Sequence, residues 1–183
     1  MLRLVSIVMV LLVGAPWSAA QQLAEQVEPQ VIYLVRHAEK SASGDQRDPA
    51  LAKLGRERAR HLAYVLGDAR IEKIFTTDYT RTRQTVEPLA NQLGLTPEVY
   101  DPRVLREFAQ QLLQTGGRSL VVGHSNTTPQ LVALLGGDAG AAIDEKSEFD
   151  RLYIVIRDRG HVTTILQRYG REPALLKVRE QTP

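Results

Sequence analysis

The order of short apolar runs and amphipathic segments predicts an α/β fold, a three-layer α/β/α sandwich with a mostly parallel central sheet. Two observations support this prediction. Short runs rich in β-branched residues alternate along the chain with segments whose apolar residues recur at helical spacing. Two of the runs, 31–35 and 119–122, are almost entirely apolar, which is typical of strands buried on both faces of a parallel sheet.

The strands are expected where apolar runs are too short for a helix. The first of them reads Val-Ile-Tyr-Leu-Val and is dominated by β-branched and aromatic residues. The expected strands are 31–35, 71–75, 97–100 and 119–122. Alternating residues at 151–157 and 161–167, joined by a turn at 158–160, predict a β-hairpin at the end of the fold.

Four helices are expected between these strands. The apolar positions recur at spacings of three and four residues, and glycine follows each segment. Thr76-Thr77-Asp78 is a typical N-cap signal for the second helix, and Pro129 lies in the first turn of the fourth. The expected helices are 54–66, from Asp78 to before Gly94, 101–115, and from Thr127 to before Gly136. Segments 41–50 and 138–150 are predicted to be loops.

Residues 1–20 have the pattern of a secretory signal peptide. Arg3 precedes an apolar stretch, and Ser18-Ala19-Ala20 supplies small residues for a cleavage site. We therefore expect a mature domain of residues 21–183 that is periplasmic or secreted, with no integral membrane segment after signal removal. An uncleaved N-terminal anchor is the alternative. The sequence contains no cysteine, which excludes a lipoprotein anchor and disulfides.

Composition and charge exclude several classes of function. The chain has 183 residues, of which 43% are hydrophobic and 24% charged, as in ordinary globular domains. The formal net charge is +2, and without the single charge of the first twenty residues, Arg3, it becomes 2 − 1 = +1. This near balance predicts no nucleic-acid partner. The four histidines are not spaced as zinc ligands, so we expect no metal and no cofactor.

Two of the expected strands end in a histidine. Arg36-His37 follows the first strand, and Gly123-His124 follows the fourth. The carboxyl ends of parallel strands meet at one edge of a sheet, so both histidines are expected in one crevice. Arg81, in the first turn of the helix that begins near Asp78, is expected to point into the same crevice.

This combination of residues is suited to phosphoryl transfer. The neutral imidazole of His37 can attack phosphorus and form a phosphohistidine. Arg36 and Arg81 can bind the phosphoryl oxygens, and free amides at a helix start would add donors. His124 is expected to donate a hydrogen bond to the transferring group. A leaving alkoxide needs a proton, so a carboxylic acid is expected nearby.

Four motifs, in order, resemble the histidine phosphatase superfamily, which has the phosphoglycerate-mutase-like fold. Arg36-His37-Ala38-Glu39 is similar to its RHG signature, although Ala38 replaces the usual glycine. The segment 48–59 resembles the D-P-x-L-T-x-x-G-x-x-R-A stretch, with Ala52 in place of the usual Thr or Ser. The segment 76–85 resembles the stretch that carries the second arginine, and 121–126 resembles the second-histidine motif.

The resemblance implies a general acid between the second arginine and the second histidine. Glu107 is the best positional match, and its alternative is a solvated helix glutamate. Another branch of the family has an acid directly after the second histidine, where this chain has Ser125. Glu39 and Glu148 are the remaining candidates for the acid.

The residues and the resemblance together imply an exported phosphomonoester hydrolase, a histidine-type phosphatase acting through a phosphohistidine on His37. The expected substrate is a phosphorylated small molecule or an envelope component. Two alternatives remain open. One is a phosphohistidine-protein phosphatase, and the other is a non-catalytic phosphate-binding module of the same fold.

Overall fold

The computed structural model describes residues 28–170 as alternating strands and helices followed by a hairpin. The expected signal peptide, 1–20, lies outside the described residues, as do the first residues of the expected mature domain and its last thirteen. The elements are β1 (Gln30–Arg36), α2 (Lys53–Leu66), β2 (Lys73–Thr76), α3 (Thr80–Leu93), β3 (Glu98–Val99), α4 (Leu105–Thr115), β4 (Arg118–Gly123), α5 (Thr127–Leu134), β5 (Arg151–Asp158) and β6 (His161–Arg168).

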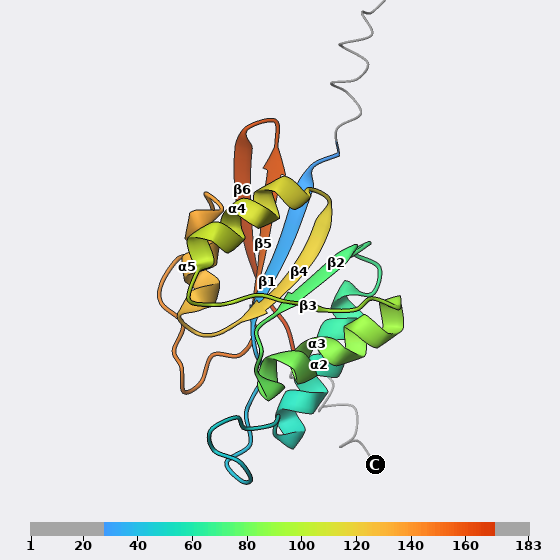
Figure 1. Ribbon diagram of the computed structural model, residues 1–183, viewed down its shortest axis with the longest axis vertical. Helices are drawn as coiled ribbons and strands as arrows, with labels where there is room; N and C mark the ends of the chain where they lie inside the picture. The colour runs from blue at the N-terminus through green and yellow to red at the C-terminus, as the bar shows by residue number, and fades with distance from the viewer. Residues whose placement is uncertain (1–27, 171–183) are drawn as a thin grey trace, which may run out of the picture.

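The six strands form one mixed sheet in the order β3-β2-β4-β1-β5-β6 (Figure 1). The pairs β1–β4, β2–β4 and β2–β3 are parallel. The pairs β1–β5 and β5–β6 are antiparallel, and the latter is the predicted hairpin. Since β1 and β4 run parallel side by side, with Arg36 opposite Gly123, both histidine-bearing ends lie at one edge of the sheet. The predicted α/β class with a mostly parallel sheet is confirmed.

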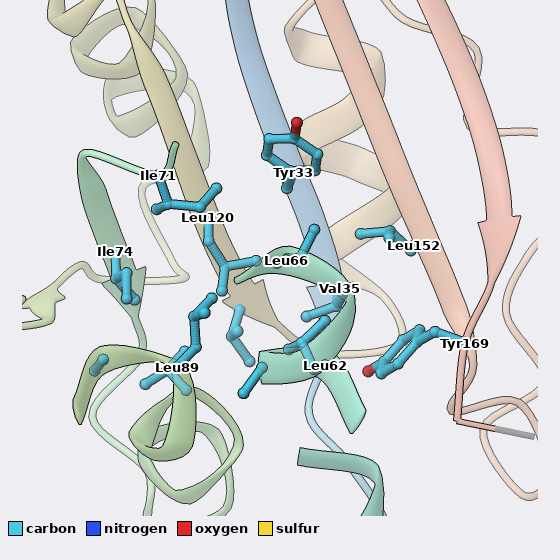
Figure 2. Packing of buried hydrophobic residues seen from close by; sticks show 14 of the residues in the cluster. Tyr33, Val35, Leu62, Leu66, Ile71, Ile74, Leu89, Leu120, Leu152 and Tyr169 are labelled. Atoms are coloured by element: carbon cyan, nitrogen blue, oxygen red, sulfur yellow. The ribbon is translucent and has the colours of Figure 1, made fainter. Parts of the chain in front are cut away.

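Successive residues of β1 face opposite sides of the sheet, and each side is covered by two helices. Tyr33 and Val35 pack with Leu62 of α2 and Leu89 of α3, as Figure 2 shows. Ile32 and Leu34 belong to the cluster on the opposite face, which includes residues of α4 and α5 such as Phe108 and Leu131. The continuous apolar run of β1 is therefore explained by burial on both faces, and the three layers are confirmed.

Helix α4 begins at Leu105, four residues later than expected. The carboxylate of Asp101 accepts a hydrogen bond from the backbone N–H of Arg103 at 2.9 Å and pairs with the guanidinium of the same residue. This local hydrogen bond forms a turn that competes with a helical start. The five residues 100–104 therefore connect β3 to α4, and Pro102 and Arg103 among them line the same pocket as the histidines.

A buried ion pair fastens α2 to the segment after β1. Arg58 donates to both carboxylate oxygens of Glu39, at 2.6 and 2.9 Å, and to the carbonyl of Tyr169 at 2.8 Å. The two charged side chains are only 9% and 15% exposed. A Cβ at Gly55 would lie 2.3 Å from the carbonyl oxygen of Glu39, so only glycine permits this approach of α2. The segment 48–59 therefore holds the chain that follows the nucleophile candidate.

Removal of one partner of this ion pair should strongly destabilise the fold. We expect Arg58→Ala to lower the free energy of unfolding by about 3–5 kcal/mol, because it leaves the Glu39 carboxylate poorly solvated without its partner. Urea denaturation followed by circular dichroism measures the change. Arg60→Ala, on the exposed face of the same helix, is the matched control and should change stability by less than about 0.5 kcal/mol. Equal losses in the two variants would contradict a specific role for the pair.

Candidate active site

A pocket of about 520 Å³ lies at the carboxyl ends of β1 and β4. It brings together His37, Arg81 and His124, three of the residues predicted from the sequence. The two imidazole rings lie edge to face with their centroids 5.5 Å apart. The full lining is His37, Lys40, Tyr79, Arg81, Pro102, Arg103, His124, Ser125, Asn126, Thr127 and Glu145. A second pocket, of about 620 Å³ beside α3, contains neither histidine.

His37 is buried, with 5% of its surface exposed, and its ring is held in one tautomer. Nδ1 lies 2.8 Å from the carbonyl oxygen of Ala38. A carbonyl can only accept, so Nδ1 carries the proton and Nε2 keeps its lone pair. Burial lowers the pKa of His37 from 6.5 to about 3, and the nearby cations Arg36 and Arg81 act in the same direction. The ring is therefore neutral at physiological pH, as a nucleophile requires.

His124 is held by partners on both ring nitrogens. Arg81 can only donate, so the 3.5 Å contact from its Nη2 makes Nδ1 the acceptor. Nε2–H then donates to Oγ1 of Thr77 at 3.1 Å, and Thr77 lies 2.9 Å from Oγ1 of Thr82. Burial and the charges of Arg81 and Arg36 lower the pKa of His124 to about 4. Nδ1 must gain a proton before it can donate to a phosphoryl oxygen, and a phosphate dianion would favour that proton.

Arg81 is positioned by a carboxylate distant in sequence. Asp48 accepts hydrogen bonds from the backbone N–H of Thr80 at 3.0 Å and from its hydroxyl at 2.7 Å. Asp48 also lies 3.7 Å from Nη1 of Arg81, and the guanidinium of Arg81 stacks on the ring of Tyr79, 4.4 Å from the ring centre. The expected cap at 76–78 is therefore wrong, because Asp48 provides the capping carboxylate.

The helix start that can support an anion is that of α5, not that of α3. The N–H groups of Thr80, Thr82 and Arg83 are already bound to Asp48 or to the carbonyl of Tyr79. By contrast, Thr127, the first residue of α5, and the two residues before it, Ser125 and Asn126, line the pocket. The positive end of the α5 dipole thus lies beside the two histidines, where it favours bound negative charge.

Arg36 is almost completely buried and does not line the pocket. Its two terminal nitrogens donate to three backbone carbonyls of the loop that precedes β5, those of Asp144, Glu145 and Glu148, at 3.3, 2.8 and 2.9 Å. Its guanidinium lies 4.0 Å from the ring centre of Phe149. Within residues 28–170 its Nε has no hydrogen-bond partner. Arg36 therefore holds the loop through its terminal nitrogens and retains one unpaired donor.

Glu107, the acid expected from the resemblance, is not brought to the pocket. Helix α4 buries Leu105, Phe108 and Leu112, which leaves Glu107 exposed and outside the pocket lining. The structure therefore does not bring Glu107 together with His37, Arg81 and His124. Glu39 is bound to Arg58, and Glu148 is bound to Arg151 and Arg168.

Sequence reasoning missed four contributors to the pocket. Glu145 lines it from a loop without any recognised motif, and Tyr79 and Arg103 form another part of its wall. The fourth is Thr77, which the sequence pattern places in a helix cap but whose hydroxyl contacts His124 in the structure. Its position directly after a buried strand was the signal that could have identified it. Two further cations lie in different places. Lys40 lines the pocket that contains the histidines, and Arg83 lines the second pocket, beside α3.

The depressed histidine pKa values predict a specific pH dependence of stability. Between about pH 6.5 and pH 4 the unfolded chain binds more protons at His37 and His124 than the folded one. Stability from these groups is complete above pH 6.5 and is lost as the pH falls. We expect a loss of about 2–5 kcal/mol between neutral pH and pH 4.5 from the two histidines. Urea titrations across this range measure it, and a His37→Gln, His124→Gln double variant should lose less. If the wild type and the double variant lost the same free energy of unfolding over this pH range, the two histidines would not be the cause of the loss.

Residues 32–114 match the family model of the histidine phosphatase superfamily (branch 1). The matched segment carries Arg36, His37 and Arg81, so three of the predicted site residues lie within this similarity. The chain is also 41% identical over 69 residues to 6-phosphofructo-2-kinase/fructose-2,6-bisphosphatase 4 of Rattus norvegicus. That match covers 35% of this chain and only 15% of the length of the relative.

Solved structures of similar fold extend the comparison beyond the matched segment. The protein histidine phosphatase SixA, complexed with tungstate, has a TM-score of 0.58 at 19% identity, covering 76% of this chain and 95% of that one. A mycobacterial glucosyl-3-phosphoglycerate phosphatase with inorganic phosphate has a TM-score of 0.59 at 16% identity, covering 78% and 98%. At these identities the likeness establishes the phosphoglycerate-mutase-like fold.

Proposed function

We propose that the protein is a phosphomonoester hydrolase that acts through a phosphohistidine on His37. One observation carries the proposal: a buried neutral imidazole with a free Nε2 lines the same pocket as Arg81 and His124. The superfamily match and the phosphatases of similar fold support a phosphatase.

The geometry supports a two-step displacement. Nε2 of His37 attacks phosphorus and the ester oxygen departs, and water then attacks the phosphohistidine and releases phosphate and neutral His37. Arg81 and the start of α5 stabilise charge on the phosphoryl oxygens. Arg36 does not line the pocket, but its buried Nε has no partner within residues 28–170 and lies in the residue before His37, so we propose it as a further contact for a phosphoryl oxygen.

Turnover by the wild-type protein tests this function. Purified residues 21–183 are incubated with para-nitrophenyl phosphate, alkyl phosphates, envelope phosphates and a phosphohistidine-containing protein, and released phosphate is measured. We expect hydrolysis of phosphomonoesters. Saturable phosphate binding without release from any substrate would support the binding module. Release from the phosphohistidine protein alone would support the phosphohistidine-protein phosphatase.

We further propose that the protein is exported, on the basis of the signal-like pattern of residues 1–20. Within residues 28–170, the structure contains no helix with the length and apolar character needed to cross a membrane. The mature protein is expected to begin at Gln21 and to fractionate with periplasm or medium. N-terminal sequencing of fractionated protein checks this, and an intact Met1 in a cytoplasmic pool would contradict it.

A further inference from the structure

The loop between α5 and β5 brings one carboxylate to the active-site pocket. Among the residues that line this pocket, within the described part of the chain, Glu145 is the only acid. It shares the pocket with His37, His124 and Arg81. Glu145 is therefore the acidic residue placed to protonate a leaving group bound in this pocket, whereas Glu107 on α4 lies outside the lining.

The main chain at Glu145 is fixed relative to the nucleophile. Arg36, the residue immediately before His37, donates to the carbonyl of Glu145 at 2.8 Å and to the carbonyl of Glu148 at 2.9 Å. The carboxylate of Glu148 accepts from the backbone N–H of Asp144 at 2.9 Å. Glu145 is thus held on both sides by hydrogen bonds of the loop, and as an exposed residue of the pocket lining it is open to solvent.

The carboxyl group of Glu145 is free to take part in proton transfer. It forms no hydrogen bond or salt bridge with any residue between 28 and 170. The other carboxylates around the site have partners: Asp48 binds Thr80, Asp101 binds Arg103, Glu39 binds Arg58 and Glu148 binds Arg151. Hydrogen bonds from arginines lower the pKa of Asp101 and of Glu148 to about 2, so these two carboxylates are poorly suited to donate a proton.

We propose that Glu145 is the general acid and base of the reaction, an inference that rests on the proposed function. In the first step, Nε2 of His37 bonds to phosphorus, the phosphorus–oxygen ester bond breaks, and the Glu145 carboxylic acid gives its proton to the leaving oxygen. In the second step, the Glu145 carboxylate takes a proton from water as the water oxygen bonds to phosphorus. The phosphorus–nitrogen bond breaks, its electron pair returns to Nε2, and Glu145 is again protonated.

Leaving-group dependence tests the acid role. Glu145→Gln should lower kcat/KM for an alkyl phosphate by about 100-fold or more, since a poor leaving group needs the proton. For para-nitrophenyl phosphate, whose phenolate departs without help, the loss should be less than about tenfold. Glu57→Gln, an exposed glutamate on α2, is the matched control and should leave both values unchanged.

The base role has a separate readout. If Glu145 activates water, Glu145→Gln should hydrolyse the phosphohistidine slowly after rapid phosphorylation by para-nitrophenyl phosphate. Stopped-flow absorbance should then show a burst of nitrophenolate equal to the enzyme concentration, and alkaline gels should show accumulated phosphoenzyme. A loss confined to folding or to loop position would produce neither a burst nor leaving-group selectivity.

Three results would overturn the inference. The first is an equal loss on both substrates, and the second is no loss on either. The third is a leaving-group-selective loss in Glu107→Gln that is absent from Glu145→Gln. Failure of the proposed function is distinguishable from all three, because the wild-type protein itself would then form no phosphoenzyme and release no phosphate.

Discussion

His37→Ala should reduce phosphomonoester turnover by more than about 10⁴-fold and remove the covalent intermediate, because no neighbouring group replaces the attacking nitrogen. The free Nε2 of His37 is created by the hydrogen bond from Nδ1 to Ala38, and burial keeps the ring neutral. A phosphoramidate is stable in base and labile in acid, unlike phosphoserine. Brief exposure of the wild type to labelled substrate and an alkaline quench should therefore leave label on the peptide that contains His37.

The control for this experiment replaces a histidine outside the pocket. His161→Ala, at an exposed position of β6, should retain wild-type turnover and label. Label on the peptide containing His124 would mean that the two pocket histidines have exchanged roles. Near-normal turnover by folded His37→Ala would exclude the phosphohistidine mechanism.

His124→Ala should lower kcat on the order of 100- to 1000-fold, since it removes a donor aimed at the charge that develops on the phosphoryl group. The variant should still label slowly at His37, because the nucleophile is intact. Steady-state kinetics and the same labelling experiment measure both effects. Complete loss of label, with the fold preserved, would place His124 in the attack itself.

Thr77→Val separates the donor role of His124 from its orientation. The hydroxyl of Thr77 accepts from Nε2 of His124 and lies against Thr82. The substitution keeps the volume and removes this acceptor, so the ring loses its fixed orientation but remains present. We expect a smaller fall in kcat than for His124→Ala. A larger fall would indicate that Thr77 stabilises the fold of the pocket more than it orients the ring.

The local pattern of the sequence was sufficient for the sheet, the layers and three of the pocket residues. The run in β1 predicted a strand buried on both faces, and the structure packs alternate residues against opposite helix pairs. Because parallel strands end at one edge, the positions of His37 and His124 at strand ends were enough to bring them together. Arg81 followed from its place in the first turn of the next helix.

The cap of α3, the partners of Arg36 and the acid at the pocket depend on contacts between distant residues. Asp48 caps Thr80 across 32 positions, and Arg36 binds the carbonyl of Glu145 across 109. No periodicity or spacing encodes which loop reaches a given strand end. The sequence determined which side chains carry the chemistry, since strand ends and helix starts are local features. Only tertiary packing decided that α4 turns Glu107 to solvent while the loop before β5 brings Glu145 to the pocket.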